Sequence, residues 1–338
     1  MAKQAVGILG TGSYVPKEEV TNAEIAGRVG VETEWIERKT QITARRYAAP
    51  SEATSDLAAA AARKALEQSG LEAPEIDYLI VATSTGDLPQ PPTAYLVQDL
   101  IGATNAACFD INVVCSGFVY GLALAQSLIQ QRPAVRALVI AADVYSRCLD
   151  FSDRRTAVLL GDGAGAAVLG ATSSPYGFVG FELASRGDAQ RLIRVEAGGS
   201  RLPASHTTLA EGQHFFRMDG RGVRDFVMEH FPPLARKLAH SAGVPLEEVQ
   251  HFVPHQPNGV LLTRLTEHAG LTRAQTHRTL ERYGNMGSAS AAVTLDEAHR
   301  AGRFNDGDLL LIGTFGGGMS LGAALLRWGA FPPPAAAA

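Results

Sequence analysis

Three residues have side chains that could share one chemistry: Cys115, His255 and Asn285. Cys115 is followed by Ser116 and Gly117, so small, permissive residues stand beside its thiol. A thiol at the start of a helix can act as a nucleophile, and the helix dipole is expected to lower its pKa. His255, in "VPHQPN", could act as a base or hydrogen-bond donor, and Asn285, in "YGNMGSAS", offers a neutral polar side chain. Taken alone, each has an ordinary alternative: a core cysteine, a loop histidine and a helix cap.

The elements that must position these residues follow an α/β pattern. Short apolar runs predict strands at 5–12, 76–85, 106–114, 137–144 and 164–171, and apolar residues at helical spacing predict helices at 54–70 and 117–131. The helix that follows Cys115 has little polar face. It is therefore expected to be buried between sheets.

The second half of the chain repeats the order of the first. After Cys115 come a helix, the strand "ALVIAADV" and the glycine-rich "GDGAGAAVLG"; after Asn285 come "NMGSASAAVTLDEAHRAG", the strand "LLLIGTFG" and "GGGMSLGAALLRWG". This predicts two similar halves, 1–174 and 175–330, followed by a flexible tail at 331–338. The three candidate residues stand at corresponding strand-to-helix junctions, and sites often form where two such halves face each other.

Composition limits the classes of function. The chain has 338 residues, is 46% hydrophobic and carries a formal net charge of −4, without a basic cluster that would suit a nucleic acid. No apolar run reaches about 18 residues and no secretory leader is recognisable, so a cytoplasmic protein outside the membrane is expected. The three cysteines form no CxxC pair, so reduced thiols and no metal site are expected.

Two glycine-rich stretches have different interpretations. "GILGTGSYVP" does not complete a GxGxxG pattern, which argues against a dinucleotide site. In "GTFGGGMS", Gly316, Gly317 and Gly318 follow a predicted strand and could direct backbone N–H groups at an oxyanion. A tight turn is the ordinary alternative.

Several motifs resemble the ketoacyl-acyl carrier protein synthase III family of the thiolase superfamily. They are "EWIERKTQI", "FDINVVCSGFVYGLALA", "GDGAGAAVL", "PHQPN", "YGNMGSASAAVTLDEA" and "GTFGGGMSLGAALLRW", and the likeness runs from about residue 5 to residue 328. The resemblance implies a five-layered α/β/α/β/α fold of two duplicated halves and a homodimer. It also implies that Cys115 carries the acyl group, that His255 and Asn285 assist decarboxylation, and that Gly317 shares an oxyanion hole with the N–H of Cys115.

The activity implied by this resemblance is a condensation that needs no cofactor beyond its coenzyme A thioester substrate. An acyl group from acyl-CoA would be loaded on Cys115 and condensed with a malonyl thioester, expected to be malonyl-acyl carrier protein, to prime fatty-acid or polyketide synthesis. An asparagine at 285 favours condensation, because a carboxylate there would repel the developing enolate. Gly259 and Val260 stand where fatty-acid members often carry a basic residue that docks the carrier protein, which leaves the second partner open. Acyl transfer to an alcohol or amine, and an inactive scaffold subunit, remain alternatives.

Substrate contacts follow from the resemblance at fewer positions. Trp35 and Arg154 match residues that hold the adenine of coenzyme A, and Lys39 replaces an arginine that suits a phosphate. Gln90 stands near a residue that lines the acyl site of the neighbouring subunit, where a polar amide suggests a starter other than plain acetyl. A solvated loop glutamine is the alternative. Phe315 is also assigned to the substrate site.

Overall fold

Two five-stranded mixed sheets with the same internal order form the framework of the protein. The computed structural model describes residues 4–329. The first sheet contains, side by side, β1 (Val6–Tyr14), β7 (Asp162–Ala171), β6 (Ala137–Val144), β4 (Tyr78–Ala82) and β5 (Ala107–Ile111). The second contains β8 (Gly177–Ser185), β14 (Ser320–Arg327), β13 (Leu309–Gly316), β11 (His251–Pro254) and β12 (Gln275–Thr276). In each sheet the first three strands are antiparallel and the last three are parallel, which matches the expected duplication.

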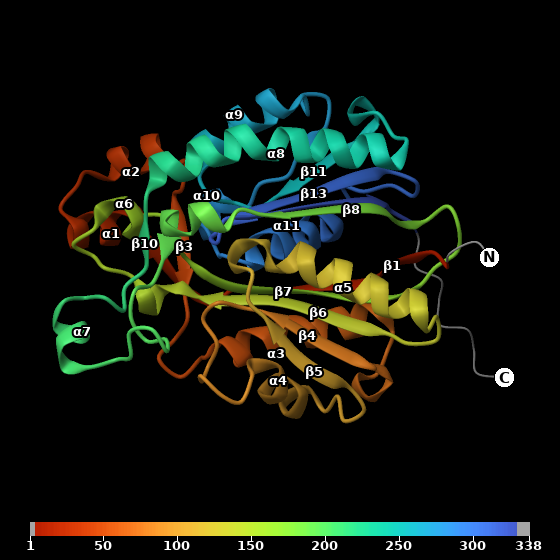
Figure 1. Cartoon of the computed structure of the whole chain (residues 1–338), viewed down its shortest axis with the longest axis horizontal. Coiled ribbons are helices and arrows are strands. Elements are labelled where there is room, and N and C mark those ends of the chain that lie inside the picture. Colours follow the sequence, from red (N-terminus) through yellow and green to blue (C-terminus); the bar gives the residue numbers. More distant parts are fainter. Residues whose placement is uncertain (1–3, 330–338) are drawn as a thin grey trace.

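Helices complete five layers (Figure 1). The outer layer on the first sheet contains α3 (Thr54–Ser69) and α4 (Thr93–Ile101), and that on the second contains α8 (Gly220–Ala242) and α9 (Gly259–Ala269). Between the two sheets lie α5 (Gly117–Gln131) and α11 (Ala289–Arg300). The predicted thiolase-like α/β/α/β/α fold is confirmed.

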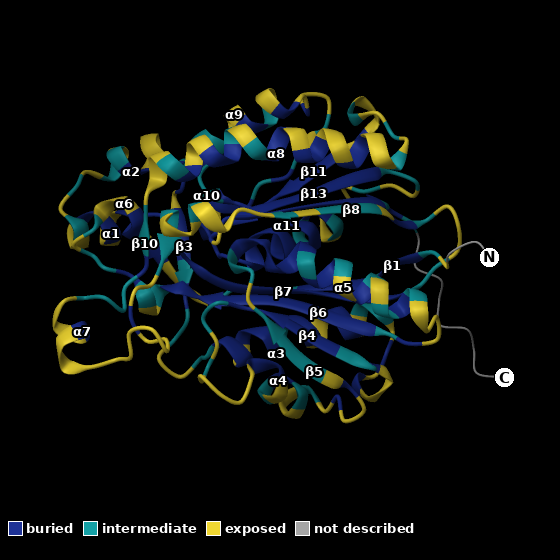
Figure 2. Ribbon diagram, in the orientation of Figure 1, coloured by how far each residue is buried: buried dark blue, intermediate teal, exposed yellow. Residues whose placement is uncertain are grey.

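The central layer is held by apolar packing from both sheets. Phe118, Val119 and Leu122 of α5 are fully buried in one cluster with Ile80 of the first sheet and Ile312 of the second. Burying a side chain of this size stabilises the fold by about 1.5–3 kcal/mol. The predicted burial of this helix is therefore confirmed for one face, whereas the other face of α5 reaches the surface, with Leu124 43% exposed (Figure 2).

The remaining elements are short, and several lie together at one end of the two sheets (Figure 1). β2 (Glu18–Thr21) pairs with β3 (Ala44–Tyr47), and β9 (Ile193–Arg194) pairs with β10 (Arg217–Met218). The short helices are α1 (Asn22–Val29), α2 (Thr33–Thr40), α6 (Arg154–Ala157), α7 (His206–Ala210) and α10 (Leu280–Tyr283). Single 3-10 turns occur at Ala73–Glu75, Val114–Ser116, Tyr145–Cys148, Gly187–Leu192 and Leu246–Glu248.

The two halves join in a short connection. β7 ends at Ala171 and β8 begins at Gly177, and the proposed division between 174 and 175 falls between them. Hydrophobic clusters contain residues of both halves, so the halves fold against each other rather than as separate domains. The predicted tail at 331–338 lies outside the described residues.

Candidate active site

One small cavity brings the three candidate residues together. Cys115, His255 and Asn285 line a space of about 30 Å³, which is closed on its other sides by mostly apolar side chains such as those of Ile193 and Phe315. The cavity lies where α5 and α11 begin and where β11 and β13 end. The duplicated strand-to-helix junctions therefore meet at one point, as expected from their order in the sequence.

Cys115 lies in the 3-10 turn that precedes α5, and it is 8% exposed. Val114 before it has a φ of 47°, a left-handed conformation that costs a residue of this kind about 1–3 kcal/mol. Gly316 approaches the same turn so closely that an added Cβ would lie 2.7 Å from Cys115 Cβ. The thiol is thus held between the start of α5 and the end of β13.

The ionisation of Cys115 differs from the sequence-based expectation. Burial raises the pKa of the thiol, and the nearby Asp143 carboxylate acts in the same direction. The nearby backbone of Cys115 and Gly317 partly opposes this rise. The expectation of a lowered pKa is wrong, because the loss of hydration outweighs the effect of the helix terminus. The thiol is therefore protonated at neutral pH.

His255 directly follows β11 and is only 2% exposed. Its backbone N–H donates to the carbonyl of Gly313 at 2.7 Å, and its ring meets the Phe315 ring edge to face with centroids 5.4 Å apart. Burial lowers the pKa of His255 to about 3, a change that the backbone of Gly287 only partly opposes. The imidazole is therefore neutral at neutral pH, with one nitrogen available as a donor and the other as an acceptor.

Asn285 stands between α10 and α11, and its main chain is fixed on both sides. Its N–H donates to the Leu159 carbonyl at 2.8 Å, and its own carbonyl accepts from Gly161 N–H at 2.9 Å. The side-chain Oδ1 accepts from Gly287 N–H at 3.0 Å. With its oxygen engaged in this way, the amide presents its NH₂ group as the free donor.

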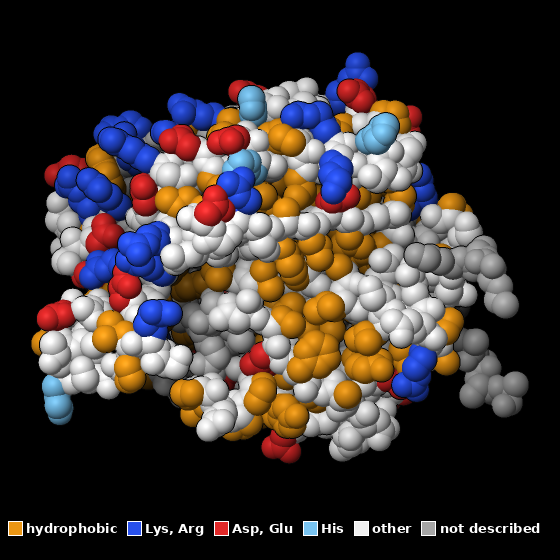
Figure 3. Space-filling view, in the orientation of Figure 1, with side chains coloured by type: hydrophobic (Ala, Val, Ile, Leu, Met, Phe, Trp, Pro, Cys, Tyr) orange, Lys and Arg blue, Asp and Glu red, His pale blue; other side chains and the backbone are white. Residues whose placement is uncertain are grey.

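A second, larger cavity connects this site with the surface. It has a volume of about 340 Å³, and it shares with the inner cavity the side chains of Leu159, Met218, Val223, Pro257 and Asn285. Its outer part contains the cationic groups of Lys39, Arg155, Arg224 and Arg264. Basic side chains gather at this end of the molecule (Figure 3). The shape and charge suit a long ligand with an anionic group outside and a reacting group inside.

The substrate residues expected from the sequence are not all at these cavities. Trp35 and Lys39 line the outer cavity, and Phe315 lines the inner one. Arg154 lies over the Trp35 ring, 5.5 Å from its centroid. Gln90 is exposed and lines neither cavity.

Sequence reasoning missed the basic residues that line the outer cavity beside Lys39. Arg155 comes from α6, Arg224 from α8 and Arg264 from α9, and none belongs to a basic cluster in the sequence. Of these three, only Arg155 could have been suspected from the sequence, because it directly follows Arg154. The three arginines are far apart in the sequence and come together at the outer cavity only in the folded chain.

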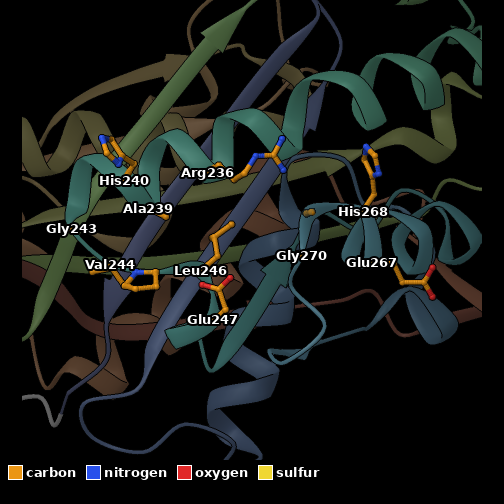
Figure 4. A pocket seen from close by; sticks show the side chains of 12 residues that line it. Arg236, Ala239, His240, Gly243, Val244, Leu246, Glu247, Glu267, His268 and Gly270 are labelled. Carbon is orange, nitrogen blue, oxygen red and sulfur yellow. The ribbon is translucent and has the colours of Figure 1, made fainter.

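Another cavity near the surface lies elsewhere and contains none of this chemistry. It measures about 560 Å³ and lies between the carboxyl ends of α8 and α9, with Arg236, His240, Glu247 and His268 among its lining residues (Figure 4). No residue of it also lines the two cavities above.

Among residues 4–329 there is no group of three or more His, Cys, Asp and Glu side chains suited to a metal ion. The helices of this same region include none that could cross a membrane.

Comparison with known proteins agrees with this geometry. Residues 109–187 match 3-Oxoacyl-(acyl-carrier-protein) synthase III, and residues 239–328 match the C-terminal part of the same synthase. An acetoacetyl CoA synthase of Streptomyces sp. strain CL190 is 50% identical over 95% of this chain and 98% of its own length. A beta-ketoacyl-acyl-carrier-protein synthase III of Caldanaerobacter subterraneus subsp. tengcongensis is 41% identical over 96% of this chain and 98% of its own.

Solved structures show the same relationship. The synthase III of Aquifex aeolicus VF5 superposes with a TM-score of 0.87 at 34% identity, covering 96% of this chain and all of that one. The priming beta-ketosynthase of the R1128 polyketide pathway superposes with a TM-score of 0.90 at 31% identity over 98% of both chains. Fold and site thus define a thiolase-fold condensing enzyme, an acyltransferase. The chain belongs to the 3-oxoacyl-acyl-carrier-protein synthase III family, and its activity is the condensation of an acyl group with a malonyl thioester.

Proposed function

We propose that Cys115 carries the acyl group between two half-reactions. In the first, the Cys115 sulfur attacks the carbonyl of an acyl-CoA, the bond to the coenzyme A sulfur breaks, and the thiol proton passes to the departing thiolate. The N–H groups of Cys115 and Gly317 would stabilise the tetrahedral oxyanion, because Gly316, directly before Gly317, lies against Cys115 at the inner cavity. The observation that carries the assignment is that Cys115, His255 and Asn285 line one cavity.

In the second half-reaction the malonyl thioester loses carbon dioxide, and the electron pair of the broken C–C bond forms an enolate. The enolate carbon attacks the acyl carbonyl, and the Cys115 thiolate leaves and regains a proton. His255 and Asn285 would donate hydrogen bonds to the enolate oxygen. Two observations support this role: the imidazole is neutral at neutral pH, and the Asn285 oxygen is engaged by Gly287, which leaves its NH₂ free.

The inner cavity supports a short, apolar starter such as acetyl. Its volume of about 30 Å³ is small, and its lining is mostly apolar. The relative named acetoacetyl CoA synthase is consistent with that size. The polar starter suggested by Gln90 gains no support from a single chain, in which this residue is exposed away from both cavities. Ranking acyl thioesters with the native protein and with Gln90→Phe tests the point: an altered ranking would restore Gln90 to the acyl pocket.

The carrier of the malonyl group has two candidates. The 50% identical relative named acetoacetyl CoA synthase favours malonyl-CoA. Val260 also favours it, because this apolar residue lines the outer cavity at a position where fatty-acid members often carry a cation that docks the carrier protein. The 41% identical synthase III favours malonyl-acyl carrier protein, as first expected from the motifs. We propose malonyl-CoA. Comparing kcat/KM for the two malonyl donors with acetyl-CoA as starter decides between them, and a preference for the carrier protein would restore the first expectation.

We also propose the homodimer that the family resemblance implies. Leu124 of α5 and the β8 residues Val179 and Leu183 are each more than one third exposed, and apolar atoms cover the corresponding face in Figure 3. The edge strand β5 is also partly exposed. An apolar face of this kind is typical of an interface between subunits. Light scattering of the purified protein tests the homodimer. The cytoplasmic location expected from the sequence stays a prediction.

The central experiment separates the remaining alternatives. Intact-protein mass is measured after incubation with acetyl-CoA, and carbon dioxide release is measured after a malonyl thioester is added. Condensation predicts an acylated protein and then carbon dioxide with a 3-ketoacyl product. Acylation followed by transfer to an alcohol or amine, without carbon dioxide, would instead support the acyl-transfer alternative.

A further inference from the structure

A buried carboxylate that the reaction does not use connects two loops of the site. Asp143, near the end of β6, is fully buried and accepts six hydrogen bonds. Its Oδ1 accepts from Thr83 Oγ1, Ser84 N–H, Ser84 Oγ and Thr85 Oγ1, at 2.9–3.2 Å. Its Oδ2 accepts from the N–H and Oγ of Ser288, at 2.8 and 2.7 Å.

The second of these contacts crosses from one half of the protein to the other. Ser288 directly precedes α11 and lies three residues after Asn285. Gly287, whose N–H holds the Asn285 oxygen, lies against the carboxylate so closely that an added Cβ would be 2.5 Å from Asp143 Oδ2. The positive end of α11 therefore faces Asp143, and this side chain is a further anchor of the loop that carries Asn285.

The donors around Asp143 suit a carboxylate. Both oxygens accept a backbone N–H, and four hydroxyl contacts complete the set. Burial raises the pKa of Asp143, while the donors from Ser84 and Ser288 act in the opposite direction. An amide NH₂ in place of either oxygen would face a backbone N–H, that of Ser84 or that of Ser288, so an asparagine cannot reproduce the contacts.

We propose that Asp143 is a positioning residue that aims the Asn285 amide at the enolate oxygen and ties its loop to the 83–85 segment of the opposite half. It touches no substrate atom and acts through Ser288 and Gly287. This role rests on the proposed function of Asn285 and predicts that loss of the carboxylate weakens decarboxylation more than acyl loading.

The test compares Asp143→Asn with the native protein in both half-reactions. Malonyl decarboxylation should fall by about 100-fold, the scale of a displacement near 1 Å at a reacting centre, and acetylation of Cys115 should stay within about threefold. A purely structural role of Asp143 would slow acetylation and decarboxylation together, so the ratio of the two rates distinguishes positioning from a loss of structure.

Two further variants make the outcome decisive. Asp296→Asn removes another fully buried carboxylate, which binds Thr11, Ser13 and Arg300 within and beside α11 but none of the site loops, and it should leave the ratio of the two half-reactions unchanged. Ser288→Ala removes one donor to Asp143 and serves if Asp143→Asn does not fold; decarboxylation should fall about tenfold, without loss of acetylation.

Asn285→Ala is measured beside them. If it slows decarboxylation and neither Asp143→Asn nor Ser288→Ala does so, the positioning role is overturned and the proposed function stands. If Asn285→Ala itself leaves decarboxylation unchanged, the proposed function fails first. An equal loss of acetylation and decarboxylation in Asp143→Asn would also overturn the proposal.

Discussion

The two central helices begin in equivalent places, yet their first turns face different groups. β13 ends against the start of α5, where the backbone of Gly316 meets Cys115. β6 ends against the start of α11, where the Asp143 carboxylate accepts the N–H of Ser288 at 2.8 Å. At the start of α5 we propose that the neighbouring N–H groups bind a substrate oxyanion, whereas the start of α11 is occupied by a carboxylate.

This difference comes from one position of a repeated strand. β6 and β13 each have eight residues, and the seventh is Asp143 in the first and Phe315 in the second. Phe315 places an apolar ring beside Cys115 and His255 that offers no acceptor to the backbone N–H groups there. The carboxylate at the equivalent place accepts hydrogen bonds from the Ser288 loop. Duplication supplies two similar junctions, and we propose that this one side chain determines whether each junction reacts or positions.

The largest expected effect tests the reactive junction. Cys115→Ala should abolish acylation by acetyl-CoA, because the nucleophilic sulfur is gone, and the protein should stay folded since only one small group is removed. Intact mass and peptide mapping measure the label. Cys108→Ala and Cys148→Ala are matched controls that should acylate normally, since neither of these thiols lines the inner cavity. A label on either of them would remove Cys115 from its assigned role.

The next effect tests the chemistry at the opposite junction. Asn285→Ala should slow malonyl decarboxylation by roughly 100-fold to 1,000-fold, the usual loss for one oxyanion donor, while acyl-Cys115 still forms. Asn285→Asp should be at least as damaging, because a negative charge would face the enolate. Carbon dioxide release and acyl-enzyme mass are measured on the same preparations, with Asn105→Ala, at an exposed turn, as the control. Equal loss of both signals would mean that Asn285 supports the fold or the nucleophile instead.

Much of this comparison could be read from the sequence, and the failures have physical causes. The strand-to-helix order located the junctions of Cys115, His255 and Asn285, because apolar periodicity is a local signal. Asp143 gave no signal, since its partner Ser288 is 145 positions away and a carboxylate at a strand end has many local uses. The raised pKa of Cys115 could not be predicted for a similar reason. The thiol is buried in part by the end of β13, which belongs to the other half of the chain.

A smaller effect tests how closely the strand end must approach the nucleophile. Gly316→Ala would place a Cβ 2.7 Å from Cys115 Cβ and 2.8 Å from its backbone nitrogen. Overpacking of this kind costs about 1–3 kcal/mol, so acetylation of Cys115 should slow by about tenfold or more. Gly27→Ala is the matched control, because a Cβ there meets nothing within 4 Å. Full activity of Gly316→Ala would show that the junction at α5 tolerates movement and that its backbone donors are not tightly placed.

The smallest effect separates the two junctions by pH. His255 has a pKa of about 3, below its ordinary value of 6.5, so it is neutral well above pH 3 and its donor role should not titrate near neutrality. In Cys115→Ala, which removes the thiol from the comparison, decarboxylation of a malonyl thioester should change less than about twofold between about pH 5.5 and about pH 8. Alkylation of native Cys115 should rise throughout this range, because its raised pKa leaves the thiolate fraction still increasing.

Since the folded pKa of His255 lies below the unfolded one, its contribution to stability is present above pH 6.5 and is lost as the pH falls toward 3. A decarboxylation rate that follows a group with a pKa between 6 and 7 would mean that the imidazole acts as a cation, and the contrast between a titrating nucleophile and a neutral donor pair would fail.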